Sequence, residues 1–166
     1  MIRKATKEDL AEIMEIIRAT VAEMRTYGNT QWDEKYPQEK DFAGDISRGD
    51  LYVDERDGEV AGFICLNLVE PVEYEDLDWS SKEKAMVVHR MAVNPKFRSK
   101  GIASRMMKFA DDLAKSSGIG YMKTDTYSVN PNMNALFLKC GYKFVGEMSF
   151  LAKEKPFNAY EKTLLK

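Results

Sequence analysis

A short basic stretch around one glycine is the part of the chain whose residue types could do binding chemistry. Arg98 and Lys100 precede Gly101, and apolar residues then recur at helical spacing. The first turn of a helix presents backbone N–H groups without intrahelical partners, together with the positive end of the helix dipole. Glycine lacks the Cβ that would block the close approach of a phosphate. The stretch therefore predicts an anion site at the start of a helix.

The charge distribution of the chain indicates which class of anion the basic stretch could bind. The chain has 166 residues and a net charge of −2, with 44% hydrophobic and 31% charged residues, as in an ordinary globular domain. Six basic residues and no acid lie between Arg90 and Ala110, whereas eleven acids and two bases lie between Asp50 and Glu83. A nucleic-acid partner would normally need a larger basic excess. The local patch instead favours a small phosphorylated ligand and no nucleic acid.

The sequence gives no sign of a membrane segment or of a metal site. No apolar run approaches the roughly 20 residues that a membrane helix needs, and the N-terminus lacks the apolar stretch of a signal peptide. We therefore expect a cytoplasmic protein with no membrane partner. Cys65 and Cys140 show no metal-ligand spacing, and His89 is the single histidine, so we expect no metal and two buried thiols.

Apolar spacing and turn residues predict the elements that must position the basic stretch. The predicted order is β-α-α-β-β-β-α-β-α-β-β, with the basic stretch between a buried strand and a helix. Thr6 and Asp9 form a variant capping-box pattern before the first helix, and Asp57 and Gly58 form a hairpin turn. The mixture of hairpins and helical connections indicates one mixed α/β domain over 1–166. The predicted strands are 2–5, 51–56, 59–68, 85–93, 121–127, 142–152 and 157–165, and the predicted helices are 6–24, 37–47, 101–115 and 130–141.

The residues after the buried strand match a known phosphate-binding spacing. A Walker loop and a dinucleotide fingerprint are excluded, because their glycine patterns are absent. Arg98, Gly101 and Ala103 instead form R-x-x-G-x-A. This pattern resembles Q/R-x-x-G-x-G/A, the pyrophosphate signature of the GNAT superfamily of N-acetyltransferases. The segments HRMAVNPKF and NPNMNALFLKCGYKFVG are similar to that family's fourth strand with its exit and to its second cofactor segment.

The resemblance implies the GNAT fold, which is the acyl-CoA N-acyltransferase fold of the α/β class. This fold has a mixed, mainly antiparallel central sheet with splayed middle strands and flanking helices. The resemblance also implies acetyl-CoA as cosubstrate, with the pantetheine arm on the main chain of the fourth strand and the pyrophosphate on the helix start. The residues implied to bind acetyl-CoA are Met91, Ala92, Val93, Arg98, Ser99, Lys100, Gly101, Ile102, Ala103, Ser104, Asn130 and Phe137.

Several of these side chains also have a purely structural interpretation. Met91 to Val93 alternate as core residues of a strand would, and Arg98 and Lys100 would be ordinary surface cations. Asn130 would be the N-cap of a helix that begins at a proline. For the strand residues both interpretations can hold together, because the cosubstrate would use their main chain.

The positions of the family's acid and base hold residues that cannot transfer protons. Many members carry a tyrosine seven residues after the cofactor asparagine, which here is Phe137, and some carry a glutamate on the fourth strand, which here is Val87. Acyl transfer can still proceed by positioning, with a backbone N–H at the oxyanion and a carboxylate that acts through water. The remaining catalytic candidates are Glu70, His89, Asp125 and Tyr127, whose structural alternatives are a solvated acid, a sheet residue, an internal cap or ion pair, and a strand-end aromatic.

The acceptor side of the family fold draws on the first two helices and on the loop between them. Here that loop carries Tyr27, Trp32 and Tyr36, which either line an acceptor pocket or pin the loop. The acids from Glu70 to Asp78, in the connector after the predicted strand 59–68, would favour a cationic amine. The substrate expected from these features is a small-molecule or peptide amine.

Three hypotheses about function follow. The main one is an acetyl-CoA-dependent N-acetyltransferase that transfers an acetyl group to a primary amine by direct attack. The alternative is a non-catalytic acyl-CoA-binding module, which Phe137 and Val87 motivate. A third hypothesis is a nucleotide-phosphate or nucleic-acid binder that uses the basic helix. Dimers are frequent in the family, so a homodimer is a further expectation.

Overall fold

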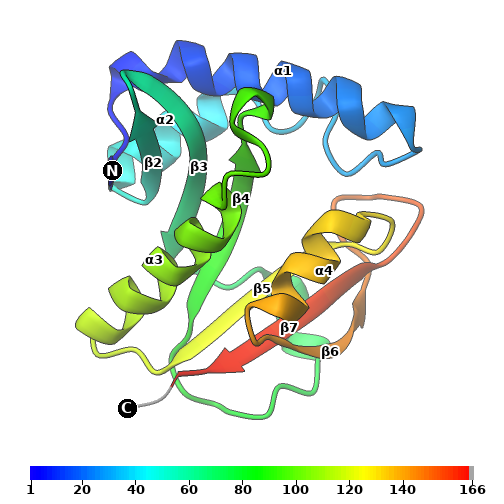
Figure 1. Cartoon of the computed structure of the whole chain (residues 1–166). Helices are drawn as coiled ribbons and strands as arrows, with labels where there is room; N and C mark the ends of the chain where they lie inside the picture. The colour runs from blue at the N-terminus through cyan, green and yellow to red at the C-terminus, as the bar shows by residue number, and fades with distance from the viewer. Residues whose placement is uncertain (165–166) are drawn as a thin grey trace. The chain divides into compact units, whose positions relative to one another are not determined.

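The computed structural model describes residues 1–164 and has the element order predicted from the sequence (Figure 1). Within this range no helix is both long and apolar enough to cross a membrane. The strands are β1 (Ile2–Lys4), β2 (Leu51–Arg56), β3 (Glu59–Asn67), β4 (Met86–Val93), β5 (Tyr121–Tyr127), β6 (Lys143–Met148) and β7 (Phe157–Thr163). The helices are α1 (Leu10–Thr26), α2 (Glu39–Arg48), α3 (Ile102–Ser116) and α4 (Pro131–Lys139), with 3₁₀ turns η1 (Lys7–Asp9), η2 (Val72–Asp76) and η3 (Pro95–Phe97).

The strands form one sheet in the order β1-β2-β3-β4-β5-β7-β6. The pairs β1–β2, β2–β3, β5–β7 and β6–β7 are antiparallel, and β4–β5 is parallel. This confirms the mixed, mainly antiparallel sheet. The register of β4 with β5 covers Met86–Val88 against Met122–Thr124. The splay of the middle strands stays a prediction.

Several predicted boundaries differ from the structure by a few residues, and two of them have a clear backbone cause. Helix α2 begins at Glu39 instead of Pro37, because Gln38 has extended backbone and its N–H donates to Asp41 Oδ2 at 2.7 Å as the N-cap. Strand β6 ends at Met148 instead of residue 152, because positive φ values of 56° and 53° at residues 151 and 152 turn the chain. Strand β7 ends at Thr163, and residue 165 of the predicted last strand lies outside the described residues.

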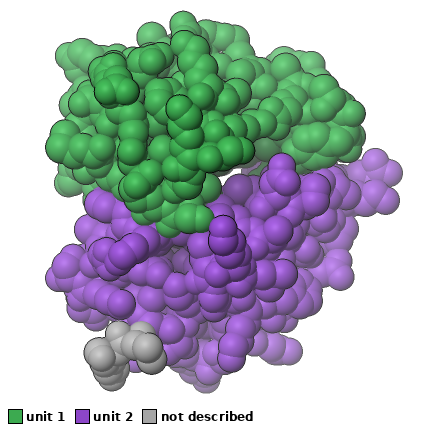
Figure 2. Space-filling view, in the orientation of Figure 1, with its two compact units in different colours: residues 1–66, 90–106 green, residues 67–89, 107–166 purple. Residues whose placement is uncertain are grey.

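The chain divides into two compact units (Figure 2). The first consists of residues 1–66 and 90–106, and the second consists of residues 67–89 and the described residues from 107 onward. Both β4 and α3 contribute to both units. The single domain expected from the sequence stays a prediction.

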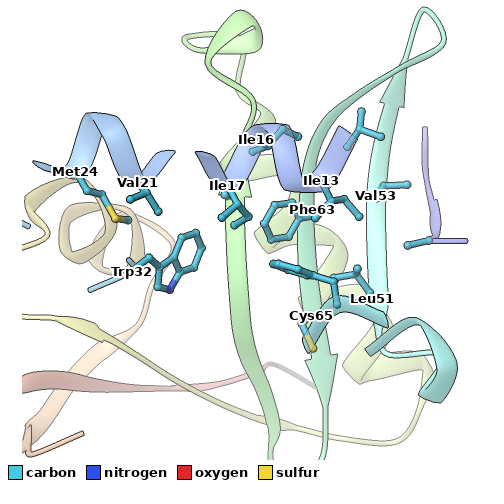
Figure 3. Close-up of a cluster of buried hydrophobic side chains, with 14 residues drawn as sticks. Ile13, Ile16, Ile17, Val21, Met24, Trp32, Leu51, Val53, Phe63 and Cys65 are labelled. Atoms are coloured by element: carbon cyan, nitrogen blue, oxygen red, sulfur yellow. The ribbon is translucent and has the colours of Figure 1, made fainter. Parts of the chain in front are cut away.

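The first unit has a core that α1, α2 and the β2–β3 hairpin share (Figure 3). Ile13, Ile17 and Met24 follow α1 at helical spacing and are buried. Phe42 of α2 contacts Phe63 of β3 edge to face, with ring centroids 5.2 Å apart. Burying a side chain of this size stabilises a fold by about 1.5–3 kcal/mol, so these residues hold both helices on the hairpin.

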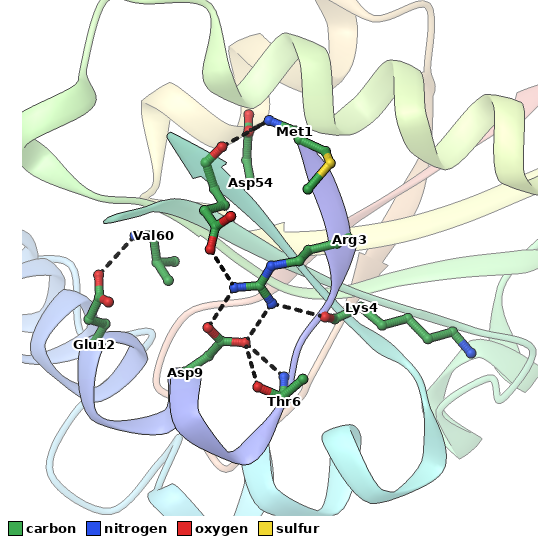
Figure 4. A network of polar contacts seen from close by, with 9 residues as sticks. Met1, Arg3, Lys4, Thr6, Asp9, Glu12, Asp54 and Val60 are labelled. Atoms are coloured by element: carbon green, nitrogen blue, oxygen red, sulfur yellow. Dashed lines mark hydrogen bonds and ion pairs between the residues drawn. The ribbon is translucent and has the colours of Figure 1, made fainter. Parts of the chain in front are cut away.

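A polar network fixes β1 and the start of α1 (Figure 4). Arg3 donates to both carboxylate oxygens of Asp9 and to Glu55 Oε1, each at 2.9 Å. The Thr6 N–H donates to Asp9 Oδ2 at 2.7 Å, as the predicted capping pattern requires. The Arg3 guanidinium holds the pKa of the Asp9 carboxyl below its usual range. Turn η1 intervenes between Thr6 and α1, so the helix begins at Leu10.

The second unit has its own core beneath the segment that joins β3 to β4. Tyr74, Val87, Tyr127, Met148 and Phe157 pack together there and are buried. We call residues 69–84 the acidic connector; it contains η2 and contributes Tyr74 to this core. The connector is therefore a packed part of the second unit and not a loose surface loop.

The two thiols differ from each other. Cys65 of β3 is buried as expected, and burial raises the pKa of its thiol to about 12. Cys140 is only partly buried, contrary to expectation, because it is the C-cap of α4 and lies at the end of that helix.

Candidate functional site

The exit from β4 is fastened to β3 by Asn94. The Asn94 N–H donates to the carbonyl of Ala61 at 2.8 Å, and its Nδ2 donates to the carbonyl of Val60 at 3.0 Å. Its Oδ1 accepts from the Lys96 N–H at 3.1 Å and caps turn η3. The basic loop therefore leaves the strand from a fixed point. The sequence prediction missed this role, although an Asn-Pro pair is a recognisable signal for a turn.

The loop then reaches α3 through two residues in the left-handed region. Ser99 has φ 62° and Gly101 has φ 75°. The Gly101 carbonyl accepts from the Arg105 N–H at 3.1 Å, which begins the helical hydrogen bonding. A Cβ placed on Gly101 would meet no described atom within 4 Å. The backbone conformation at this position thus favours glycine, and a side chain there would begin in open space.

A second glycine lets α3 pack closely on the hairpin. A Cβ on Gly62 of β3 would lie 3.0 Å from the Ala92 carbonyl oxygen, 3.0 Å from Met106 Cε and 3.2 Å from Ile102 Cγ2. Gly62 therefore allows the main chain of β4 and the first turn of α3 to approach β3. The sequence signal for this role was a glycine inside a strand, which often marks close approach of another backbone.

The basic side chains of this loop have different surroundings. Arg98 is exposed and forms an ion pair with Glu23 of α1. Lys100 is exposed, with its Nζ 5.7 Å from the ring centroid of Phe97. Met91 and Ala92 are buried in β4. Whether any of these residues contacts a cosubstrate stays a prediction.

The helix-linking loop of the first unit is held by an ion pair that the sequence prediction missed. Arg90 of β4 donates two hydrogen bonds to Asp45 of α2, at 2.9 and 2.6 Å, and one to the Tyr36 hydroxyl at 2.7 Å. Trp32 is buried in the core of the first unit beside Val21 (Figure 3). Trp32 and Tyr36 thus pin the loop.

Tyr27 is the third aromatic side chain named for an acceptor pocket. It follows the C-terminal end of α1, and 42% of it is exposed. Of the three aromatics in this loop, Tyr27 therefore has the most surface available for a ligand.

The predicted cofactor residues of the second unit occupy structural positions. The Asn130 Oδ1 accepts from the Met133 N–H at 3.2 Å, so Asn130 is the N-cap of α4. Phe137 is buried, with its ring centroid 5.8 Å from that of Tyr142 and 5.5 Å from that of Tyr160. Phe137 thus fills the core at the position where many family members carry a phenol.

The four catalytic candidates all lie in the second unit, and two of them are committed to other groups. Glu70 accepts from Lys123 Nζ at 2.6 Å. His89 Nε2 lies 2.6 Å from Asn67 Oδ1, which also accepts from the Val69 N–H at 2.9 Å. Because the backbone N–H identifies that atom as the amide oxygen, Nε2 of His89 carries a proton and cannot accept one.

Tyr127 and Asp125 are close in sequence but differ in availability. Tyr127 is buried, and its hydroxyl accepts from the Lys155 N–H at 3.1 Å. Asp125 is half-buried, and its Oδ2 accepts from the Tyr74 hydroxyl at 2.5 Å. Burial raises the pKa of Asp125 to about 6, against the lowering effect of the Tyr74 hydrogen bond. Asp125 is therefore poised to exchange a proton near neutral pH.

Binding of a metal ion would need a group of ligating side chains in the described part of the chain. Residues 1–164 contain no group of three or more His, Cys, Asp or Glu side chains that could hold a metal ion. The chemistry that these residues can perform themselves is anion binding at the start of α3 and proton exchange at Asp125.

Comparison with known proteins identifies similar chains. A family model described as the acetyltransferase (GNAT) family matches residues 14–142. YesJ of Bacillus subtilis (strain 168), named an uncharacterized N-acetyltransferase, is 25% identical over 146 residues, which are 86% of this chain and 81% of YesJ. The structure of a GNAT-family acetyltransferase from Streptococcus agalactiae 2603 is 26% identical with a TM-score of 0.86, over 100% of this chain and 96% of that one.

A more distant structure adds information about the fold alone. The yncA protein of Salmonella typhimurium, solved with its cofactor acetyl-CoA, is 16% identical with a TM-score of 0.73, over 100% of this chain and 94% of that one.

Proposed function

Because the chain belongs to the acetyltransferase (GNAT) family, we propose that it is an acetyl-CoA-dependent N-acetyltransferase acting on a primary amine of a small molecule or peptide. The observation that carries the proposal is the start of α3, where Gly101 with φ 75° faces open space. Membership of the family supports acetyl transfer, and yncA, of the same fold, was solved with acetyl-CoA. A homodimer, a cytoplasmic location and one domain over 1–166 stay predictions.

The first turn of α3 fits a pyrophosphate. A Cβ on Gly101 would meet nothing within 4 Å, so a ligand can approach the main chain at this residue. The helix dipole adds partial positive charge, and Lys100 adds a full one. We assign the pyrophosphate of acetyl-CoA to the N–H groups of 99–104 and its pantetheine arm to the main chain of Met91–Val93. When bound, acetyl-CoA supplies an activated acyl group as a thioester.

Asp125 is the residue of this chain best suited to take the proton of the amine. Its pKa of about 6 lets it be a carboxylate at neutral pH while keeping useful proton affinity. The amine nitrogen forms a bond to the acetyl carbonyl carbon, and the carbon–sulfur bond to CoA breaks. One amine proton is released, and Asp125 is our candidate for the base that takes it up. The thiolate leaves without a positioned phenol, since Phe137 cannot donate a proton and a thiol of pKa about 8.5 is a tolerable leaving group.

The non-catalytic alternative is kept because of two particular residues. Phe137 and Val87 occupy the positions of the family's acid and base, and both are buried in the core. A chain that only binds acyl-CoA would need neither group. The two proposals differ in one measurable quantity, which is the release of CoA.

Turnover of acetyl-CoA tests the proposal. The purified chain is mixed with acetyl-CoA and a panel of alkylamines, polyamines and peptides with free α- or ε-amino groups, and the free thiol is followed with a thiol-reactive dye. We expect amine-dependent CoA release that Asp125→Asn lowers by about 10²–10⁴-fold. Tight binding of acetyl-CoA without release for any amine would favour the binding module. Binding of an oligonucleotide or nucleotide but not of acetyl-CoA would instead support the phosphate-binder hypothesis.

A further inference from the structure

Tyr74 lies at the centre of the acidic connector's own fold. Its N–H donates to the Pro71 carbonyl at 3.0 Å, and its carbonyl accepts from the Leu77 N–H at 3.2 Å and from Trp79 Nε1 at 2.7 Å. The Tyr74 side chain is 1% exposed within the core of the second unit. The turn therefore presents this phenol in one fixed orientation.

The two sides of the turn that carries Tyr74 are held on β5 by the same lysine, Lys123. Lys123 donates to Glu70 before the turn at 2.6 Å, and its Nζ lies 4.3 Å from the ring centroid of Trp79 after the turn. The Lys123 side chain is 6% exposed. A buried ammonium held by a carboxylate and an aromatic ring resists displacement. The turn that carries Tyr74 is thus clamped on either side.

Between these two anchors, the Tyr74 hydroxyl meets Asp125. It donates to Asp125 Oδ2 at 2.5 Å, a length typical of a strong bond from a hydroxyl to a carboxylate. Asp125 follows Lys123 by two residues on β5, so both side chains project from the same face of the strand. The Tyr74 hydroxyl engages Oδ2 and leaves the other oxygen, Oδ1, outside this hydrogen bond. One oxygen is thereby fixed, and the other is left to accept a proton.

We propose that Tyr74 is a positioning residue for Asp125: its hydroxyl holds Oδ2, orients Oδ1 for the incoming proton, and sets the pH below which the carboxylate stops accepting it. This inference rests on the proposed function, because it makes Asp125 the base of acetyl transfer. In this proposal the acidic connector positions the Tyr74 hydroxyl against the carboxylate of Asp125.

The charged groups around Asp125 determine the direction of the effect. Burial raises its pKa, the Tyr74 hydrogen bond lowers it, and Glu73 of the connector raises it. On its own strand Lys123 is paired with Glu70. Neighbouring strand β7 carries three titratable groups: Tyr160, which donates to Asn134, Glu161, which accepts from the Tyr121 hydroxyl and lies opposite Lys123, and Lys162, which is paired with Asp111. On β4, His89 follows the last residue paired with β5. Removing the Tyr74 hydroxyl removes the one lowering contribution, so the pKa of Asp125 must rise.

Carbon-13 NMR of the Asp125 carboxyl tests this without any acceptor. We expect a midpoint near 6 in the unmodified protein and an upward shift of about one unit in Tyr74→Phe, since a hydrogen bond to a charged group has about this effect. The matched control is Tyr142→Phe. Tyr142 is also buried, but unlike that of Tyr74 its hydroxyl has no hydrogen-bond partner among the described residues. Its Asp125 midpoint should not move. Equal midpoints in all three proteins would overturn the inference.

The unmodified protein provides a second test that does not depend on how the variant folds. The ring carbons of Tyr74 should report the same midpoint as the Asp125 carboxyl, because the two groups share one hydrogen bond. A Tyr74 ring that does not respond as Asp125 titrates would contradict the pairing.

Kinetics then connects the pair to catalysis. With the panel amine that gives the fastest CoA release, the acid limb of kcat/KM should move upward in Tyr74→Phe by the shift that NMR records, and it should stay in place in Tyr142→Phe. In an Asp125→Asn background, Tyr74→Phe should cause no further loss, because Tyr74 acts only through Asp125. An unshifted limb, or an additive loss in the double variant, would refute the positioning role. If no panel amine releases CoA, the proposed function fails, whereas the NMR titration still decides the effect of Tyr74 on Asp125.

Discussion

Replacing Gly101 by glutamate should abolish most of the affinity for CoA while leaving the chain folded. The glycine has φ 75°, so any other residue there is strained by about 1–2 kcal/mol. Its position also faces open space, so the new side chain meets no described protein atom at its Cβ. Two unit charges about 6 Å apart in water repel by about 0.7 kcal/mol. Against the two charges of a pyrophosphate this is about 1.4 kcal/mol, or a tenfold loss of affinity.

Gly118 provides a matched control for the strain. It has φ 76°, a Cβ there would also meet nothing within 4 Å, and it follows the opposite end of α3. Gly118→Glu should therefore lose similar stability and retain CoA affinity. The two variants separate the conformational cost of replacing a left-handed glycine from the electrostatic cost of a carboxylate at the anion site.

Titration calorimetry with CoA, alongside the melting temperature of each variant, is the assay. The affinity gap between the two variants should narrow as salt rises from 50 mM to 500 mM, because the Debye length falls and the repulsion is screened. Equal CoA affinity in folded Gly101→Glu and Gly118→Glu would refute the assignment of the pyrophosphate to the start of α3.

Further predictions concern packing, charge and pH. Gly62→Val should lower stability by about 1–3 kcal/mol in chemical denaturation, because its Cβ would lie 3.0 Å from a main-chain oxygen of β4. Asp45→Asn should cost about 3–5 kcal/mol by leaving Arg90 without its carboxylate, and an equally stable variant would contradict the assigned ion pair. Asn130→Ala should cost about 0.5–2 kcal/mol through loss of the α4 N-cap, as measured by thermal unfolding. The pKa of Asp125 is about 6 in the folded protein and lower in the unfolded chain, so protonation of Asp125 favours the folded state. This contribution is fully present at pH 3 and is lost as the pH rises through 6. The substitution Asp125→Asn should therefore stabilise the protein, relative to the unmodified chain, more at pH 7 than at pH 4, as measured by thermal unfolding at the two pH values.

The order of elements could be predicted because each one carries a local signal. Val87 lies in an unbroken apolar strand, Gly101 opens an apolar-periodic helix, and Asn130 precedes a proline at the start of a helix. These signals depend on neighbours in the sequence, which share the same local geometry. They were enough to predict the fold class, and the anion site at the start of α3 stays a prediction.

What the sequence could not predict depends on contacts between distant residues. Strand β7 lies between β5 and β6, although β6 precedes it in the chain, because strand order is decided by packing. Tyr74 is 51 residues from Asp125, and Arg90 is 45 residues from Asp45. No local pattern connects such pairs, so the acidic connector was interpreted as a charged segment and its one buried phenol was missed.

Neither compact unit is a continuous piece of chain, and this limits how the protein could have evolved or can be dissected. The chain passes from one unit to the other at residues 66–67, 89–90 and 106–107, within β3, β4 and α3. A truncation at any of these points would cut a strand or helix and leave an unpaired edge or end. Gene fusion and domain shuffling exchange continuous segments of chain. Because each unit consists of two separate segments, one such event cannot replace a whole unit. Substitutions in either unit are therefore best studied in the intact chain.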